Sequence, residues 1–100
     1  MVRWATFAIT RVRYNKAGTR ILQVMRRKDL GDRLGKPIIR TRQQIVIAIG
    51  KHYTYVTTYK EKDGWIRGDK VIRYLLDGEY FIRTDGNKKK SDNLGKLPRF

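Results

Sequence analysis

The side chains with the most evident chemistry in this 100-residue chain are its cations: 24 lysines and arginines stand against nine aspartates and glutamates. One stretch of the chain holds a dense group of them: Arg26, Arg27, Lys28, Arg33, Lys36, Arg40 and Arg42. Guanidinium and ammonium groups bind phosphate oxygens through charge-assisted hydrogen bonds. The formal net charge of +15 opposes compaction by self-repulsion, so a polyanionic partner is the natural explanation. Nucleic acid comes first, an anionic membrane surface second and an acidic protein third.

A second basic group consists of Lys88, Lys89 and Lys90, and we expect it to act as a flexible arm along a nucleic-acid backbone. A helix that begins after Thr41 would add unpaired N–H groups suited to a phosphate. If the basic loop before that helix folds beside its start, all these groups form one positive patch. Six to eight phosphate contacts would give a log–log salt dependence of about −5 to −7. The alternative is a solvated surface that contacts nothing specific.

A row of tyrosines, Tyr53, Tyr55 and Tyr59, has two interpretations. On an exposed sheet face, aromatic side chains among cations can stack unpaired bases. Tyrosines at strand spacing more often pack in the core and point their hydroxyls at its rim, which is the interpretation the pattern favours. Because nothing resembles the ribonucleoprotein motifs of RNA-recognition domains, the sequence favours duplex DNA, bound through its backbone, over RNA or single strands.

Carboxylates could instead build a metal-dependent nuclease, which needs two or three of them around one ion. Asp69, Asp77, Glu79 and Asp85 lie near one another in the sequence, but Asp77 and Asp85 each precede a glycine, where aspartate serves turns. His52 has no evident partner for base catalysis, and the chain has no cysteine. No P-loop, G-x-G-x-x-G or G-x-S-x-G motif is present. The sequence therefore predicts a non-enzymatic protein without a metal or cofactor.

The elements that must position these residues begin with a hairpin. Residues 3–14 have strand composition, and a β-bulge between Ile9 and Val12 would reconcile their apolar positions. A turn at 15–18 leads to a returning strand at 19–27. Residues 28–37 contain two glycines and a proline, which argue for a long loop.

The densest apolar stretch, residues 41–59, predicts a helix, a glycine stop and a strand. Thr41 and Gln44 form a T-x-x-Q capping box, and Ile45 and Ile49 stand on one helix face. Gly50 is expected to end the helix in the left-handed conformation. A β-strand over 45–49 is the competing interpretation, because its residues are β-branched or small.

Two D-G turns, at 63–64 and 77–78, separate the remaining strands, which are expected over 53–59, 65–76 and 79–84. The fold class is therefore α+β: a small curved antiparallel sheet or partial barrel of about five strands with one helix, in the order β-β-α-β-β-β. Residues 1–100 form one domain, in which a flexible basic segment, 85–93, precedes a tail that docks through Leu94, Leu97 and Phe100. No apolar run is long enough to span a membrane, which predicts a cytoplasmic protein.

The order of these signals resembles the DUF3892 family of small prokaryotic and viral proteins. The resemblance rests on Ile9-Thr10-Arg11-Val12-Arg13, on the aromatic strand after Gly50, on Phe81-Ile82-Arg83-Thr84 and on the tail Asp92-Asn93-Leu94-Gly95-Lys96-Leu97-Pro98. The tail is the most specific part. The basic stretch 28–36 and the lysine run before the tail depart from the family's pattern. The resemblance implies the fold and assigns no function.

These observations lead to two hypotheses from different classes. The first is a non-enzymatic module that binds duplex DNA through backbone phosphates with weak sequence preference. The second is a small viral or mobile-element module that docks on an acidic protein or a nucleoprotein complex. In the second case the edge strands of the sheet could also pair with a partner or form a homodimer.

Overall fold

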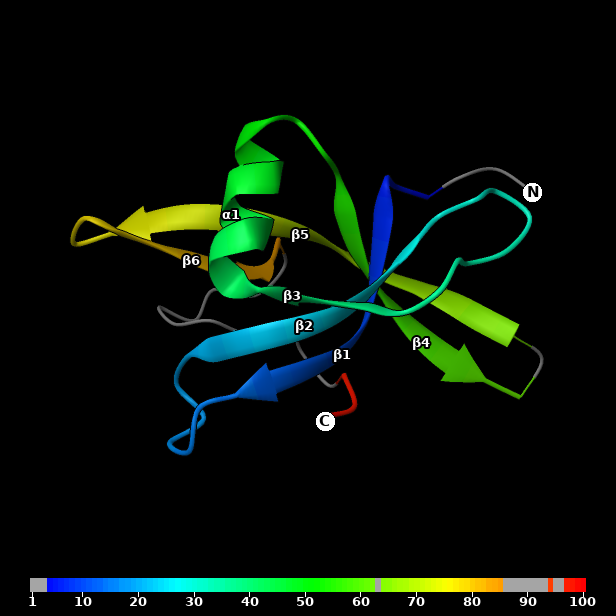
Figure 1. Ribbon diagram of the computed structural model, residues 1–100, viewed down its shortest axis with the longest axis horizontal. Coiled ribbons are helices and arrows are strands. Elements are labelled where there is room, and N and C mark those ends of the chain that lie inside the picture. The colour runs from blue at the N-terminus through cyan, green and yellow to red at the C-terminus, as the bar shows by residue number, and fades with distance from the viewer. Residues whose placement is uncertain (1–3, 63, 86–93, 95–96) are drawn as a thin grey trace.

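The computed structural model describes residues 4–62, 64–85, 94 and 97–100, which form one twisted sheet with a single helix on it (Figure 1). In chain order, the elements are β1 (Phe7–Tyr14), β2 (Ile21–Lys28), β3 (Ile38–Thr41), α1 (Arg42–Gly50), β4 (Tyr55–Glu61), β5 (Gly64–Leu76) and β6 (Glu79–Thr84). The sheet order is β3-β2-β1-β4-β5-β6. No helix among the described residues is long and apolar enough to cross a membrane.

The α+β class and the order of the predicted strands and helix are confirmed, with one strand added: β3 (Ile38–Thr41) precedes α1 in the chain and makes six strands rather than about five. Two further details of the sheet differ from expectation. The expected antiparallel sheet is mixed, because β1 and β4 pair in parallel over residues 7–9. It is also open rather than a barrel, and the short strand β3 forms one edge. The parallel pair follows from the connection: α1 carries the chain from β3 across β2 and β1, and a helical crossover of this kind returns the chain in the same direction.

The bulge predicted in the first strand is confirmed. Ile9 pairs with Arg26 and Arg11 pairs with Met25, so Thr10 is an extra residue on β1. The extra residue turns Ile9 and Val12 toward the same side, and both are buried in the core. It also turns the alternate residues after it, Arg11 and Arg13, to the side of the sheet that α1 does not cover.

The start of α1 follows the sequence prediction, and its end does not. The N–H of Gln44 donates to Thr41 Oγ1 at 3.2 Å, and the N–H of Thr41 donates to Gln44 Oε1 at 2.9 Å, so the capping box is complete. The left-handed residue is His52, with φ of 71°, while Gly50 is the last helical residue. A Cβ on Gly50 would lie 2.7 Å from Arg73 Nη1, so the glycine makes room for that arginine.

The core lies between the sheet, α1 and the C-terminal tail. Leu94 and Leu97 are buried in the same cluster as Ile9 and Val12. The N–H of Val12 donates to the Pro98 carbonyl at 3.0 Å, and the N–H of Phe100 donates to the Val12 carbonyl at 3.2 Å. Because β4 pairs only with the first half of β1, the tail covers the strand edge that β4 leaves open.

Candidate nucleic-acid interface

The structure divides the predicted basic group of β2 between the two faces of the sheet. Arg26 lies on the face covered by α1, where its guanidinium is 4.0 Å from the centre of the Phe7 ring. Arg27 lies on the opposite face, which we call the helix-free face, and its guanidinium is 5.4 Å from the Trp65 ring. Two adjacent arginines therefore meet different surroundings.

On the helix-covered face, the cations contact other side chains of the protein. Burial lowers the pKa of the Arg26 guanidinium, and the charge of Arg40 lowers it further. Arg26, Arg40 and Tyr53 line a hollow of about 250 Å³ beside α1. Here the predicted basic and aromatic residues do come together, but Arg26 is held over an aromatic ring rather than turned to solvent.

Arg42, at the start of α1, is also engaged. Its Nη2 donates to Glu79 Oε1 at 3.1 Å, and Arg20 donates to both oxygens of the same carboxylate. The hydrogen bond from Arg20 is the main reason why the pKa of Glu79 falls to about 2, and the bond from Arg42 adds to it. The contact joins the start of β2, the start of α1 and the start of β6. Arg42 therefore helps to hold these elements together.

The basic loop does not fold beside the start of α1, because β3 lies between them (Figure 1). Arg33 and Lys36 are exposed in that loop. The loop is built around Asp29, which is 2% exposed and accepts hydrogen bonds from the N–H groups of Trp4 at 2.7 Å and Gly31 at 2.9 Å. The single positive patch expected from the sequence is therefore divided. The lysine arm of Lys88, Lys89 and Lys90 lies outside the described residues.

The tyrosine row separates into three environments. Tyr55 is 2% exposed and cannot stack a base, and burial raises the pKa of its hydroxyl. Tyr59 is half-buried and packs against the core. Tyr53 is exposed and lies next to the left-handed His52. The stacking hypothesis is therefore wrong for Tyr55, and the core interpretation fits Tyr55 and Tyr59.

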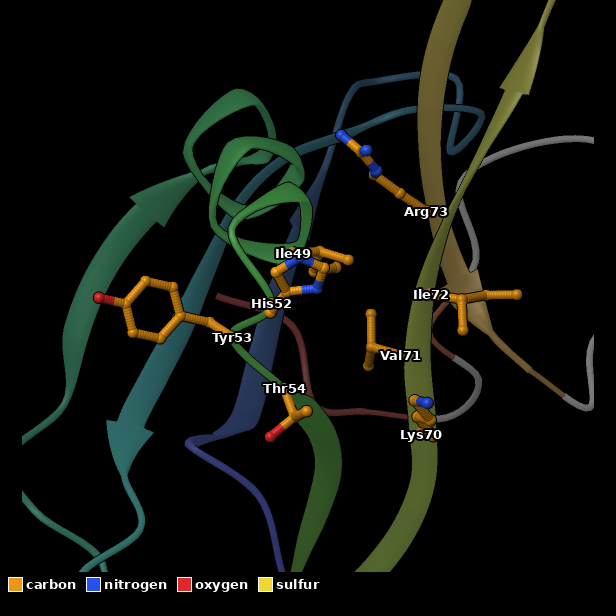
Figure 2. A pocket seen from close by; sticks show the side chains of 8 residues that line it. All are labelled: Ile49, His52, Tyr53, Thr54, Lys70, Val71, Ile72 and Arg73. Atoms are coloured by element: carbon orange, nitrogen blue, oxygen red, sulfur yellow. The ribbon is translucent and has the colours of Figure 1, made fainter.

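A hollow of about 340 Å³ lies between the end of α1 and β5. Figure 2 shows His52 beside Ile49 on one side of it and Val71 pointing toward them from β5, and Lys70 also lines the hollow. Arg73 reaches across toward α1, where its Nη1 donates to the Val46 carbonyl at 3.4 Å. This arginine stabilises the carbonyl end of the helix, which carries the negative end of the helix dipole.

The helix-free face holds cations that the sequence analysis did not select. Lys60 pairs with Trp65 across the β4–β5 hairpin, and Thr58 pairs with Arg67, so these side chains share one face. Arg11 and Arg27 join Lys60 and Trp65 around a hollow of about 260 Å³. Arg11, Lys60 and Arg67 are exposed, and no described carboxylate forms an ion pair with them. Alternation across the D-G hairpin could have revealed the Lys60, Trp65 and Arg67 group.

Comparison with protein families gives a match that covers most of the chain. The family described as protein of unknown function (DUF3892) matches residues 8–98. The chain belongs to the DUF3892 family. No curated protein and no solved structure gives a significant match. The match includes the first strand and most of the tail, as the resemblance implied.

The motifs that mark DUF3892 in this chain serve the fold in large part. Ile9, Val12, Phe81, Ile82, Thr84, Leu94 and Leu97 are all buried. The motif residues outside the core include Pro98 of the tail, which is exposed, and Arg11 and Arg13, which the bulge exposes on the helix-free face. The family description assigns no activity, so a function must be argued from the arrangement of the side chains.

The acidic residues of this DUF3892 protein do not converge. Asp77 is in the left-handed conformation of a two-residue hairpin turn, and Glu79 is bound by arginines. Among the residues that the structure describes, no three histidine, cysteine or acidic side chains lie close enough to hold a metal ion. The described part of the chain therefore offers no support for the nuclease hypothesis.

Proposed function

We propose that this DUF3892 protein binds nucleic acid through backbone phosphates, with the helix-free face of its sheet as the main contact surface. The observation that carries the proposal is the hollow around Trp65, whose lining includes Arg11, Arg27 and Lys60 and, among the described residues, no acidic side chain. Arg67 extends the same face along β5. Cations gathered in this way repel one another, and a polyanion removes that repulsion.

The basic loop adjoins this face. Arg27 Nη1 donates to the Gly35 carbonyl at 3.0 Å, which fixes the loop beside β2. Arg33 and Lys36 on either side of Gly35 are exposed there, as is Lys28. A nucleic-acid strand that crosses the helix-free face could therefore continue along the loop. The proposed surface therefore includes part of the basic group predicted from the sequence. It contains Arg11, Lys60 and Arg67 in place of the residues at the start of α1.

A salt series of binding measurements tests the proposal. The double variant Arg11→Gln/Lys60→Gln removes two exposed cations from the helix-free face, while Lys16→Gln/Lys51→Gln removes two exposed cations from elsewhere. Each lost phosphate contact lowers the slope of log affinity against log salt by about 0.9, so the first variant should lose about 2 from that slope. Its affinity near 0.1 M salt should fall on the order of 50-fold, because each contact contributes about 0.9 log unit per decade of salt.

Fluorescence anisotropy with labelled DNA and RNA, single-stranded and duplex, measures both quantities. We expect the Lys16→Gln/Lys51→Gln control to bind nearly as the unmodified protein does. If both double variants weaken binding equally, net charge alone determines the attraction and the proposed face is wrong. Absence of binding to every nucleic acid at low salt would reject the proposed function itself.

A protein-interaction role is the second candidate, and the edge strand β3 favours it. Ile38 and Ile39 are exposed on this four-residue strand, which has no neighbour on its outer side among the described residues. An unpaired edge with apolar side chains can add a strand from a partner or from a second copy. Ile39→Lys should abolish such an association in analytical ultracentrifugation and leave nucleic-acid affinity intact. A monomeric protein that captures no acidic partner would remove this candidate.

A further inference from the structure

The hollow beside Trp65 has the properties of a site for one unpaired nucleotide. We infer that it accepts a base against Trp65 and a phosphate against Arg27, so that the protein prefers single strands to duplexes. The inference rests on the proposed function and names the form of nucleic acid that the helix-free face selects. It departs from the duplex preference that the sequence suggested.

Arg27 places a fixed cation at the hollow. Its Nη1 is held by the Gly35 carbonyl, so the guanidinium has a fixed direction. Its Nε is buried, and none of the described residues accepts a hydrogen bond from it. The guanidinium lines the hollow, so a phosphate bound there could accept charge-assisted hydrogen bonds from its other N–H groups.

Trp65 places an aromatic ring at the same hollow. Its indole is half-buried, and it lines the hollow with Met25 and Pro98 as apolar neighbours. The Arg27 guanidinium is 5.4 Å and Lys60 Nζ is 4.8 Å from the ring centre, and Lys60, which is exposed, would have to move aside to admit a base. A flat π surface among cations suits a nucleotide, whose base stacks on the ring while its phosphate contacts the cations.

The shape of the site favours single strands. In a duplex the bases are stacked on one another, and only a strand with splayed bases can place one of them against a partly enclosed indole. Arg11 lines the hollow from β1, and Arg67 lies on the same face of β5 as Trp65, so both could contact neighbouring phosphates of the strand. Sequence preference is not implied, since every base has a face that can stack.

The fluorescence of Trp65 itself tests the inference. In a Trp4→Phe protein, Trp65 is the remaining tryptophan, since the chain has two. Titration with a short oligothymidylate should quench its emission in a saturable manner, with the same midpoint as the anisotropy of a labelled copy. A duplex of equal length should bind more weakly. Trp65→Leu, which keeps apolar bulk without a π surface, should lower single-strand affinity about tenfold, and Trp65→Phe should lower it less.

Tyr80→Leu is the matched control, because Tyr80, on β6, is also an aromatic residue with an arginine over its ring, although it is more exposed than Trp65. It should leave single-strand affinity unchanged. If the oligonucleotide binds by anisotropy while Trp65 emission stays constant, or if the duplex binds at least as well, the inference fails and the proposed function stands. If no nucleic acid binds at all, the proposed function fails and the inference fails with it.

Discussion

Arg26 and Arg27 are neighbours on β2, yet they show how differently the two faces of the sheet use the same kind of side chain. On the helix-covered face, Arg26 lies against Phe7, Arg73 against the end of α1 and Arg42 against Glu79. On the helix-free face, Arg11 and Arg67 are exposed and have no carboxylate partner among the described residues. Part of the net charge therefore stabilises the fold, and another part is available to a partner.

The comparison changes how the charge of the chain is understood. Composition indicates that a polyanionic partner is expected, but it does not say which cations that partner would meet. Which cations are open to a partner depends on the face of the sheet that each strand residue occupies. A one-residue change in register moves every side chain of the strand to the other face. The predictions below test whether the two faces are as separate as the structure indicates.

The largest effect is expected where α1 meets the core. Ile45→Ala should lower the free energy of unfolding by roughly 2–5 kcal/mol, because Ile45 is fully buried and its loss leaves a cavity. Ile47→Ala, in the same helix but 48% exposed, is the control and should cost far less. Urea unfolding gives both values. Nucleic-acid affinity of the folded Ile45→Ala protein should be unchanged; a loss would mean that the two faces are coupled.

A somewhat smaller loss is expected for Gly68→Ala, which lies on the strand that carries Trp65 and Arg67. A Cβ there would lie 2.3 Å from Thr57 Oγ1 and 2.9 Å from the Thr57 carbonyl oxygen, so β4 and β5 would have to separate. Forced contacts of this kind cost about 1–3 kcal/mol. Thermal unfolding should show the loss, and binding should weaken because the helix-free face is displaced.

Gly35→Ala is the matched control for that substitution. Its Cβ would lie no closer than 3.5 Å to any neighbour, which is ordinary van der Waals contact. It should change stability little. A Gly68→Ala protein as stable as the Gly35→Ala protein would show that β4 and β5 can separate without cost.

The adjacent arginines of β2 give a direct test of the two faces. Arg27→Gln should weaken nucleic-acid binding roughly five- to tenfold and lower the salt slope by about 0.7 on a single strand or about 0.9 on duplex DNA. Arg26→Gln should leave binding intact and lower the free energy of unfolding by about 1 kcal/mol, through loss of the contact with Phe7. Anisotropy and urea unfolding of both proteins measure the four quantities. The reverse pattern would place the interface on the helix-covered face.

The smallest effect concerns Glu79, and it appears as a dependence of stability on pH. The pKa of Glu79 in the folded protein is about 2, below its ordinary value of 4.5. Its pairing with Arg20 and Arg42 therefore adds stability above about pH 4.5, and this stability is lost as the pH falls toward 2. The unmodified protein should show this decrease in melting temperature. Glu79→Gln should lack that part of the decrease, and identical curves would contradict the pairing.

Local signals were sufficient for much of the fold. The capping box at Thr41, the bulge between Ile9 and Val12 and the D-G turn at 77–78 each depend on residues close in sequence, and the structure contains all three. The parallel pairing of β1 with β4 depends on where α1 returns the chain, and the bounds of single elements do not contain that information. The prediction that Gly50 is left-handed was wrong, because this position needs a glycine to make room for Arg73, which is distant in sequence.

The site was less predictable than the fold. Runs of cations such as 26–28 attract notice in a sequence, but alternate residues of a strand face opposite sides. The hollow around Trp65 draws its cations from β1, β2 and β4, so no single stretch of the chain contains it. Trp65 itself follows a turn glycine, and only its pairing with Lys60 shows which face it occupies.

The position of the C-terminal tail has a consequence for the order of folding. Val12 exchanges backbone hydrogen bonds with Pro98 and Phe100, and Leu94 and Leu97 complete the core around it. Strand β1 therefore cannot finish its pairing until residues 98–100, which follow it by more than 80 positions, are available. Contacts between such distant parts of a chain slow folding, and an incomplete β1 edge is prone to aggregation in the meantime. We expect refolding to be slow for a domain of this size, with its rate limited by docking of the tail.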